Sequence, residues 1–188
     1  MSIEKFRELP EEREERIPFR APKVPWGRRI GAFAIDFFTI WLISLPFAGA
    51  GLLQSFVFAG GWICLRVFLP ANNRGQSLGR WALDIKVLEE RANRIPTLIA
   101  MMKREGITGA GAVLAANGLM IGLTNAMILV LLTAPLVVDC VLALGDEDYR
   151  QAFHDRIAKT ITAQSQRGFS LDLRLKKLVA KIQRSMRQ

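Results

Sequence analysis

One carboxylate lies inside a long apolar run of this sequence, with basic residues at the start of the run. Asp36 stands in residues 26–45, which open on the pair Arg28 and Arg29 and then turn apolar. On a helix, Arg29 and Asp36 share a face because they are seven residues apart. An aspartate within a membrane span costs about 3 kcal/mol on insertion scales, which makes it a functional-site hypothesis by default.

Two kinds of chemistry suit Asp36. A proton or sodium carrier needs a group of this kind, which binds a cation, is neutralised by it and then releases it. The structural alternative is that Asp36 pairs with Arg29 or Arg66, or accepts hydrogen bonds from neighbouring helices, and so fixes helix packing. The sequence leaves both open.

The charges of the chain are segregated from its apolar residues. Of 188 residues, 51% are hydrophobic, and 26 Lys and Arg stand against 17 Asp and Glu, a net charge of +9. Residues 37–65 and 106–138 carry no charge at all. This pattern predicts an all-α, multi-pass integral membrane protein. The basic excess then indicates contact with the anionic headgroups of a lipid bilayer, and no nucleic acid partner is expected.

The apolar runs predict about four transmembrane helices, at residues 29–45, 52–69, 107–122 and 124–144. The segment 70–105 and the chain after 145 are both basic, so the positive-inside rule places both in the cytoplasm, with both termini on that side. An even number of spans must then separate them. The alternative is three spans, with residues 107–118 along the interface. Arg66 is expected to snorkel to the membrane surface.

The remaining segments are expected to lie outside the bilayer. Residues 1–25 predict a charged cytoplasmic tail, and residues 96–105 an interfacial helix. Alternating residues at 82–88 and β-branched residues at 156–163 predict a small cytoplasmic β-ribbon, which needs the helices to pack on. Residues 164–188 predict a basic amphipathic helix for a lipid surface or a partner protein. Its basic side carries Arg174, Lys177, Lys181 and Arg184.

Three short motifs follow one another along the chain. They are Arg29-x-x-Ala32-x-x-x-Asp36, Gly75-Gln-Ser-Leu-Gly79-Arg80 followed by the strand-like DIKVL, and Gln151-Ala-Phe-His154-Asp155-Arg-Ile-Ala-Lys-Thr160. Together they resemble the RDD family of small membrane proteins, named for one arginine and two aspartates, over about residues 26–163. Mild departures are Ser77 for Thr, Arg80 for Lys and Lys159 for Gly.

The resemblance assigns roles to individual residues. It implies that Arg29 is the family arginine, Asp36 the first aspartate and Asp155 the second, with Asp139 a weaker match. The family is suspected of transport, and some members are reported to be sodium/proton antiporters. We therefore expect an ion or proton pathway from these four residues. A structural motif is expected from Gly75, Gly79, Arg80, His154 and Thr160.

The motif residues also have plainer interpretations. The segment from Gly75 to Arg80 lacks the pattern of a phosphate loop, and Gly79 is expected to permit a tight turn. Asp155 is expected to cap backbone groups or to pair with Arg29 or Arg80.

No enzyme is predicted. His154 is the only histidine, Cys64 and Cys140 form no CxxC pattern, and no nucleophile–base constellation occurs, so no metal and no cofactor are expected.

Two function classes remain. One is transport of ions or small solutes through Asp36, as a homo-oligomer. The other is an accessory or assembly factor that docks onto a larger membrane complex through its charged ends. Removal of residues 1–25 or 169–188 would abolish docking and leave transport intact.

Overall fold

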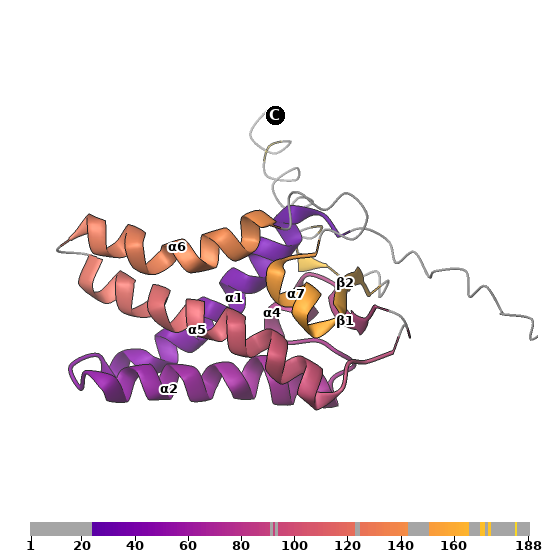
Figure 1. Ribbon diagram of the computed structural model, residues 1–188, viewed down its shortest axis with the longest axis horizontal. Coiled ribbons are helices and arrows are strands. Elements are labelled where there is room, and N and C mark those ends of the chain that lie inside the picture. Colours follow the sequence, from indigo (N-terminus) through magenta and orange to yellow (C-terminus); the bar gives the residue numbers. More distant parts are fainter. Residues whose placement is uncertain are drawn as a thin grey trace, which may run out of the picture.

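Four long helical segments lie side by side, and the short elements gather at one end of them (Figure 1). The computed structural model describes residues 24–90, 92, 94–122, 125–142, 151–165, 170, 171, 173 and 183. The predicted tail 1–25, apart from its last two residues, lies outside the described residues. So does most of the predicted helix 164–188, including Arg174, Lys177, Lys181 and Arg184.

The first segment is α1, Trp26–Ser44, close to the predicted span 29–45. Its buried residues Ala32, Asp36, Ile40 and Ser44 recur every four positions, as a helix with one inward face requires. A 3-10 turn, η2 (Leu45–Phe47), follows the helix and carries Pro46 in its first turn, where the missing N–H is tolerated.

The second segment has a wide turn in its middle. It runs as α2 (Leu52–Ile63), a π-helical turn η3 (Cys64–Phe68) and α3 (Leu69–Asn72). Pro70 has no N–H to donate to the carbonyl of Arg66, so the α-helical ladder fails there, and Leu69 N–H bonds to Cys64 instead. Arg66 lies inside this turn and is buried, only 4% exposed. The expectation that Arg66 snorkels to the surface was wrong, because buried carboxylates pair with it in the interior.

The third and fourth segments form an antiparallel hairpin, as expected for the second apolar run. They are α5 (Leu98–Gly122) and α6 (Ala126–Leu142), and they pack closely on each other. A separate interfacial helix at 96–105 was a wrong prediction. Those residues are the first turns of α5, and Arg104 and Glu105 within them are buried. Their charges face buried partners and not a lipid surface.

Two helical segments are long and apolar enough to cross a membrane within the described part of the chain. They are Trp26–Phe47 and Leu52–Asn72, and Ala126–Leu142 is a shorter apolar helix. Only 28% of each apolar window is buried, so these are not enclosed core helices. Large apolar side chains such as Phe38, Leu42 and Phe56 point outward instead, as lipid-facing surfaces do.

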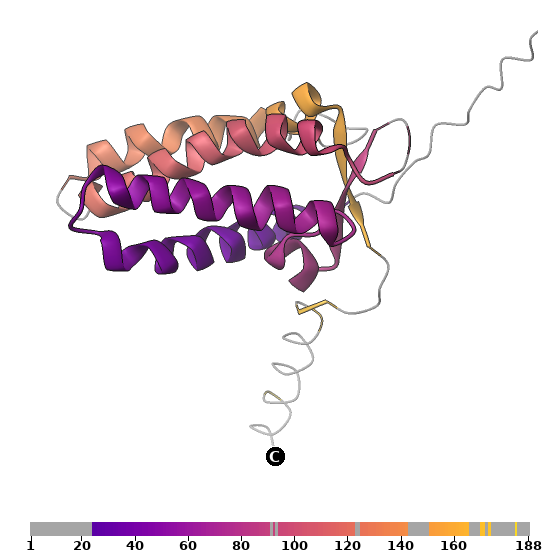
Figure 2. The same ribbon diagram turned by 90° about the horizontal axis from the view of Figure 1, so that it is seen from below.

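A two-stranded antiparallel ribbon closes one end of the bundle (Figure 2). β1 (Ile85–Glu89) pairs with β2 (Thr160–Gln164), with Val87 opposite Thr162. The ribbon was predicted, but its second strand was expected at 156–163. The short helix α7 (Phe153–Ala158) occupies the start of that stretch, and the strand begins at Thr160. Another short helix, α4 (Leu78–Ala82), leads into β1. Both strands are buried against the helices, which stabilise a ribbon that would be marginal alone.

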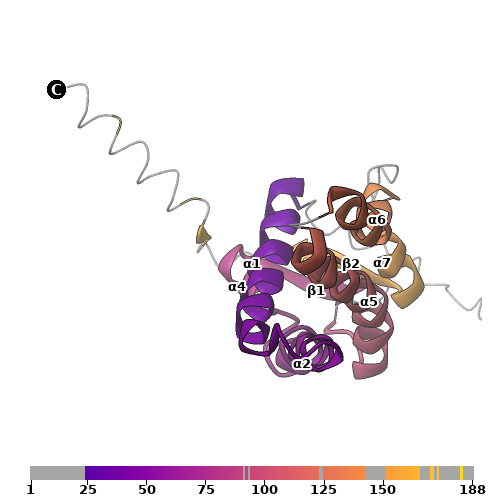
Figure 3. The ribbon, with the colours of Figure 1, turned by 90° about the vertical axis from the view of Figure 1, so that its left-hand side faces the viewer.

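The apolar core joins α1, α2 and α5. Phe58 stacks on Trp62 and meets Phe37 edge to face, with small residues of α5 such as Ala112 beside them. Viewed along the bundle, the long segments follow one another around it in the order α1, α2, α5 and α6 (Figure 3). The remaining side, between α1 and α6, holds the site described next.

Candidate functional site

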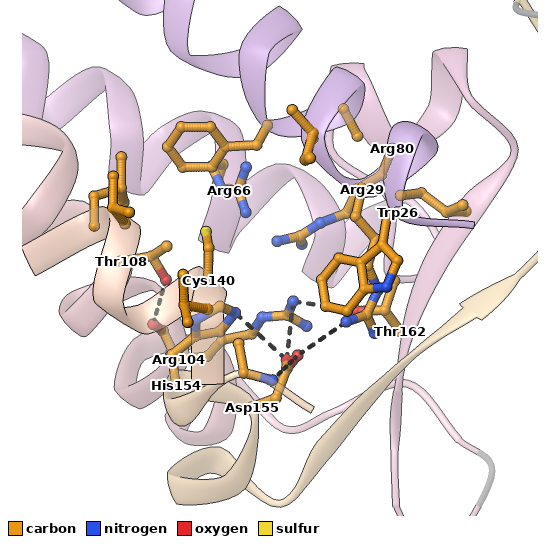
Figure 4. Close-up of a pocket in the computed structure, with 18 residues that line it drawn as sticks. Trp26, Arg29, Arg66, Arg80, Arg104, Thr108, Cys140, His154, Asp155 and Thr162 are labelled. Carbon is orange, nitrogen blue, oxygen red and sulfur yellow. Dashed lines mark hydrogen bonds and ion pairs between the residues drawn. The ribbon is translucent and has the colours of Figure 1, made fainter. Parts of the chain in front are cut away.

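A cavity of about 470 Å³ lies between α1 and α6. α5 and the ribbon end of the molecule close its inner side (Figure 4). One wall is apolar, with Ile30, Phe33, Leu136, Val137 and Val141. The other carries what we call the arginine cluster, namely Arg29, Arg66, Arg80 and Arg104, beside His154 and Asp155.

Asp36 lies behind this cluster and accepts three hydrogen bonds. Its Oδ2 accepts from Arg66 Nη1 at 3.0 Å and from the Ser77 hydroxyl at 2.6 Å, and its Oδ1 accepts from Gly79 N–H at 2.7 Å. The side chain is fully buried. Three donors from two other elements hold this carboxylate in place, so it joins α1 to α4 and to the π-helical turn.

Arg66 and Glu105 form the centre of the ion-pair network. Arg66 Nε donates to Glu105 Oε2 at 2.7 Å, so Arg66 bridges Glu105 and Asp36. Its guanidinium carbon lies 4.7 Å from the centroid of the Trp62 ring. Buried ion pairs persist only with good geometry and further partners, and Arg66 has both.

Arg80 and Arg104 share the other oxygen of Glu105. Arg80 Nη2 donates to Glu105 Oε1, and Arg104 Nε lies 3.4 Å from the same oxygen. Burial, helped by Arg66 and Arg104 and opposed by Glu105, lowers the pKa of Arg80 to about 10. Arg80 therefore remains cationic at neutral pH. Within the described residues, Nη1 of Arg80 and Nη1 of Arg104 are buried without a hydrogen-bond partner.

Asp155 is the second carboxylate at the cavity, and cations surround it. Arg104 Nη2 lies 3.0 Å away and Arg29 Nη1 3.9 Å away, and His154 Nε2 lies 3.6 Å away. Burial favours the neutral acid, but Arg104, His154 and Arg29 outweigh it and hold the pKa of Asp155 below its usual value. Asp155 is thus an anion at neutral pH. It also caps α7, accepting from Ala152 N–H at 3.4 Å.

His154 connects this group to α6. Its Nδ1 lies 2.5 Å from Asp139 Oδ2, and its backbone N–H donates to Asp139 Oδ1 at 3.1 Å. His154 and Asp139 are both buried. The pair ties α7 to α6 at the edge of the cavity.

The two glycines of the central motif have different tasks. Gly75 has φ +80°, the left-handed conformation of a turn, and its carbonyl accepts from Val87 N–H at 3.0 Å. A Cβ on Gly79 would lie 2.0 Å from the carbonyl oxygen of Ala32. Gly79 was expected to permit a tight turn, but it permits close approach of α4 to α1, which lets its N–H reach Asp36.

The charges of the site leave a small positive excess. Four arginines face three carboxylates, Asp36, Glu105 and Asp155, so this group carries one extra positive charge. A fourth carboxylate, Asp139, lies beside His154 and is not in this count. An excess cation beside unused guanidinium N–H groups suits a monoanion better than a sodium ion.

The structure brings together most of the residues singled out from sequence. Arg29, Asp155 and His154 line the cavity, and Asp139 lies directly behind His154. Asp36 lies deeper, where it pairs with Arg66.

Sequence reasoning missed Arg104 and Glu105. The usable signal was a single acid beside two cations, directly before the uncharged run 106–138. Within the described residues, no group of three or more His, Cys, Asp or Glu side chains is placed to hold a metal ion.

Comparison with known proteins gives one result. The model of the RDD family matches residues 23–159, which include the whole cavity except Thr162. No curated protein and no solved structure matches the chain.

Proposed function

This chain belongs to the RDD family, and on that premise we propose that it is a multi-pass membrane protein that binds one monoanionic solute in the arginine-lined cavity as a step in solute transport. The observation behind the proposal is the cavity between α1 and α6, with three buried arginines and the half-buried Arg29 on one wall. Two of them keep a buried N–H group without a partner. Such donors gain most from a charged acceptor, because a buried polar group left unpaired is costly.

The proposal moves the solute site away from Asp36. Three donors already hold that carboxylate and Arg66 already pairs with its charge, so a sodium ion there would compete with a bound guanidinium. We assign Asp36 to anchoring α1. Arg29, Asp155 and Asp139 keep their proposed place in the pathway, at the polar end of the cavity beside His154.

The proposed topology has four membrane segments and both chain ends on the cytoplasmic side. α1, the α2–α3 segment, α5 and α6 supply the segments, and the ribbon end carries the basic residues Arg94, Lys103 and Arg104. Basic loops favour the cytoplasmic side. The chain is proposed to act as a non-enzymatic protein among anionic lipids. The alternative role as an assembly factor depends on the two charged ends, which lie outside the described residues.

Anion binding is tested on purified protein in a non-ionic detergent. Thermal unfolding is followed with sodium methanesulfonate, sodium octanesulfonate and the chloride salts of sodium and choline. A ligand of the native state raises the unfolding midpoint. We expect at least one sulfonate to raise it, whereas exchange of sodium for choline leaves it unchanged.

The matched variant removes one positive and one negative charge together. Arg104→Gln with Asp155→Asn leaves the net charge unchanged and should abolish the sulfonate effect. Lys103→Gln, at the exposed neighbour of Arg104, should retain it. If the unfolding midpoint changes when sodium is exchanged for choline but not when the anion is exchanged, the protein binds a cation and the anion site is rejected.

A further inference from the structure

The cavity has an opening on its apolar side. Ile30 of α1 and Val137 and Val141 of α6 line it, and each is more than half exposed. α1 belongs to a segment that is long and apolar enough to cross a membrane, and α6 is a shorter apolar helix. In a bilayer, this opening between two apolar helices therefore faces lipid tails and not water.

Charge and apolar surface are only partly separated along the cavity, because the guanidinium carbon of Arg66 lies 5.5 Å from the centroid of the Phe33 ring. Arg29 and Cys140 lie towards the ribbon end, whereas Phe33 and Leu136 lie four residues further along α1 and α6. Four residues of helix correspond to about 6 Å. The acidic group of a ligand on the arginine cluster would therefore leave its apolar part beside Phe33 and Leu136, pointing out through the opening.

From these observations, and resting on the proposed anion site, we propose that the ligand is an amphiphile with one negative charge, which enters sideways from the bilayer between α1 and α6. Its acidic group is the carboxylate of a long-chain acid or the phosphodiester of an anionic phospholipid. Both present the oxygen pair that a guanidinium fork binds. One negative charge also matches the single positive excess of the site.

The chain and the charge of such a ligand have separate roles. Moving an acyl chain from lipid into an apolar cavity gains little, because lipid tails are as apolar as the cavity wall. The acyl chain of the ligand gives it access through the lateral opening, and the arginine cluster selects for its negative charge. Neutral amphiphiles of the same length should therefore bind poorly, and small water-soluble anions should reach the site poorly.

The two cysteines of the chain supply the assay. Cys140 lines the cavity, whereas Cys64 lies on the π-helical turn outside it, and both are exposed. Cys64→Ser protein reports on Cys140, and Cys140→Ser protein reports on Cys64. Each is placed in nanodiscs of neutral phosphatidylcholine and treated with N-ethylmaleimide, and labelling is followed by intact mass.

Oleate should slow labelling of Cys140 about tenfold at ten times its Kd, by mass action, and leave Cys64 unchanged. Oleyl alcohol and methanesulfonate should protect neither cysteine. Phosphatidylglycerol in the nanodisc in place of part of the phosphatidylcholine identifies the source of the acid. Protection by that lipid indicates a phospholipid ligand, and protection by oleate alone indicates a long-chain acid.

A matched pair of variants tests lateral entry without touching the ion pairs. Val137→Trp narrows the opening and should abolish the effect of oleate on Cys140. Val138→Trp, on an equally exposed neighbour that does not line the cavity, should preserve it. An unchanged oleate effect in Val137→Trp would reject entry through this opening.

The controls separate this inference from the proposed function. Protection of Cys140 by methanesulfonate as strong as that by oleate would keep the anion site and overturn the amphiphile. Protection by oleyl alcohol as strong as that by oleate would overturn recognition of charge, and with it both proposals. Absence of protection by oleate, phosphatidylglycerol and methanesulfonate would also overturn both.

Discussion

The carboxylate of Asp36 lies 3.0 Å from the guanidinium of Arg66, although the two residues are 30 positions apart. The pair joins the first helix to the π-helical turn of the second segment. Arg66 carries the connection on to Glu105 of α5, 2.7 Å away. A buried chain of ion pairs, Asp36–Arg66–Glu105, therefore joins three of the four long segments.

Removal of the Asp36 charge should destabilise the protein. Asp36→Asn leaves Arg66 with one carboxylate in place of two, and loss of one partner of a buried pair costs about 3 kcal/mol at the low end. Denaturant unfolding in mixed micelles measures the difference. The paired change Asp36→Leu with Arg66→Met should lose less than the sum of the single changes, since it leaves no buried charge unmatched.

The same variant separates anchoring from transport. In proteoliposomes with a pH-sensitive dye, a carrier aspartate predicts that Asp36→Asn keeps a stable fold and loses all flux under a sodium or pH gradient. An anchoring role predicts instead that Asp36→Asn lowers the stability of the fold. A variant as stable as wild type would contradict the anchoring role.

Substitution at Gly79 should be severe. Its Cβ would lie 2.0 Å from a backbone oxygen of α1, so Gly79→Ala forces α4 away and costs Asp36 a hydrogen bond. We expect a loss of at least about 3 kcal/mol, the upper end of overpacking effects. Gly106→Ala is the control, because a Cβ there meets nothing within 4 Å and the helix should gain up to about 1 kcal/mol. Equal effects in unfolding experiments would argue against the close approach.

Adjacent cations on α5 should behave differently. Arg104 is buried between Glu105 and Asp155, so Arg104→Gln leaves both carboxylates short of a partner and should cost about 3–5 kcal/mol. Lys103 is exposed, and Lys103→Gln should change stability by no more than about 0.5 kcal/mol. Similar unfolding midpoints for the two variants would show that the network contributes nothing to stability.

The contribution of Asp155 should depend on pH. The pKa of Asp155 is held below its usual value, so the folded state binds its proton less readily than the unfolded state. The stabilisation is therefore present above the unfolded pKa, about 3.9, and is lost as the pH falls through the folded value. The stability difference between wild type and Asp155→Asn should be constant from pH 7 to 5 and shrink below pH 4. A difference that stays constant to pH 3 would contradict this.

The proposed topology makes a prediction about accessibility. Single cysteines are introduced at Ala48, Ala92 and Met127 of a protein that lacks Cys64 and Cys140. Ala48 and Met127 lie in or beside the turns that join the long helices, and Ala92 follows β1. In intact cells an impermeant maleimide should label the first two positions and not Ala92. Labelling of Ala92 together with Ala48 would rule out four spans with a cytoplasmic ribbon.

Much of this architecture could be predicted from local signals. The uncharged runs predicted the long helices, Pro46 marked the end of the first, and alternation at 82–88 indicated the strand that forms β1. The order of three short motifs indicated the RDD family, which the family model confirms. These features depend on periodicity and on residues close in sequence, so the sequence alone determined them.

The partners within the site were decided by the tertiary structure. From sequence, Asp36 had two candidate partners, Arg29 and Arg66, and Asp155 was matched to Arg29 or Arg80, with Arg104 not considered. Packing placed Arg66 in a π-helical turn beside Asp36 and placed Arg104 beside Asp155. Coulomb attraction favours any close pair of opposite charges equally, so only the packing of α1, α5 and the ribbon end selects which arginine meets which carboxylate.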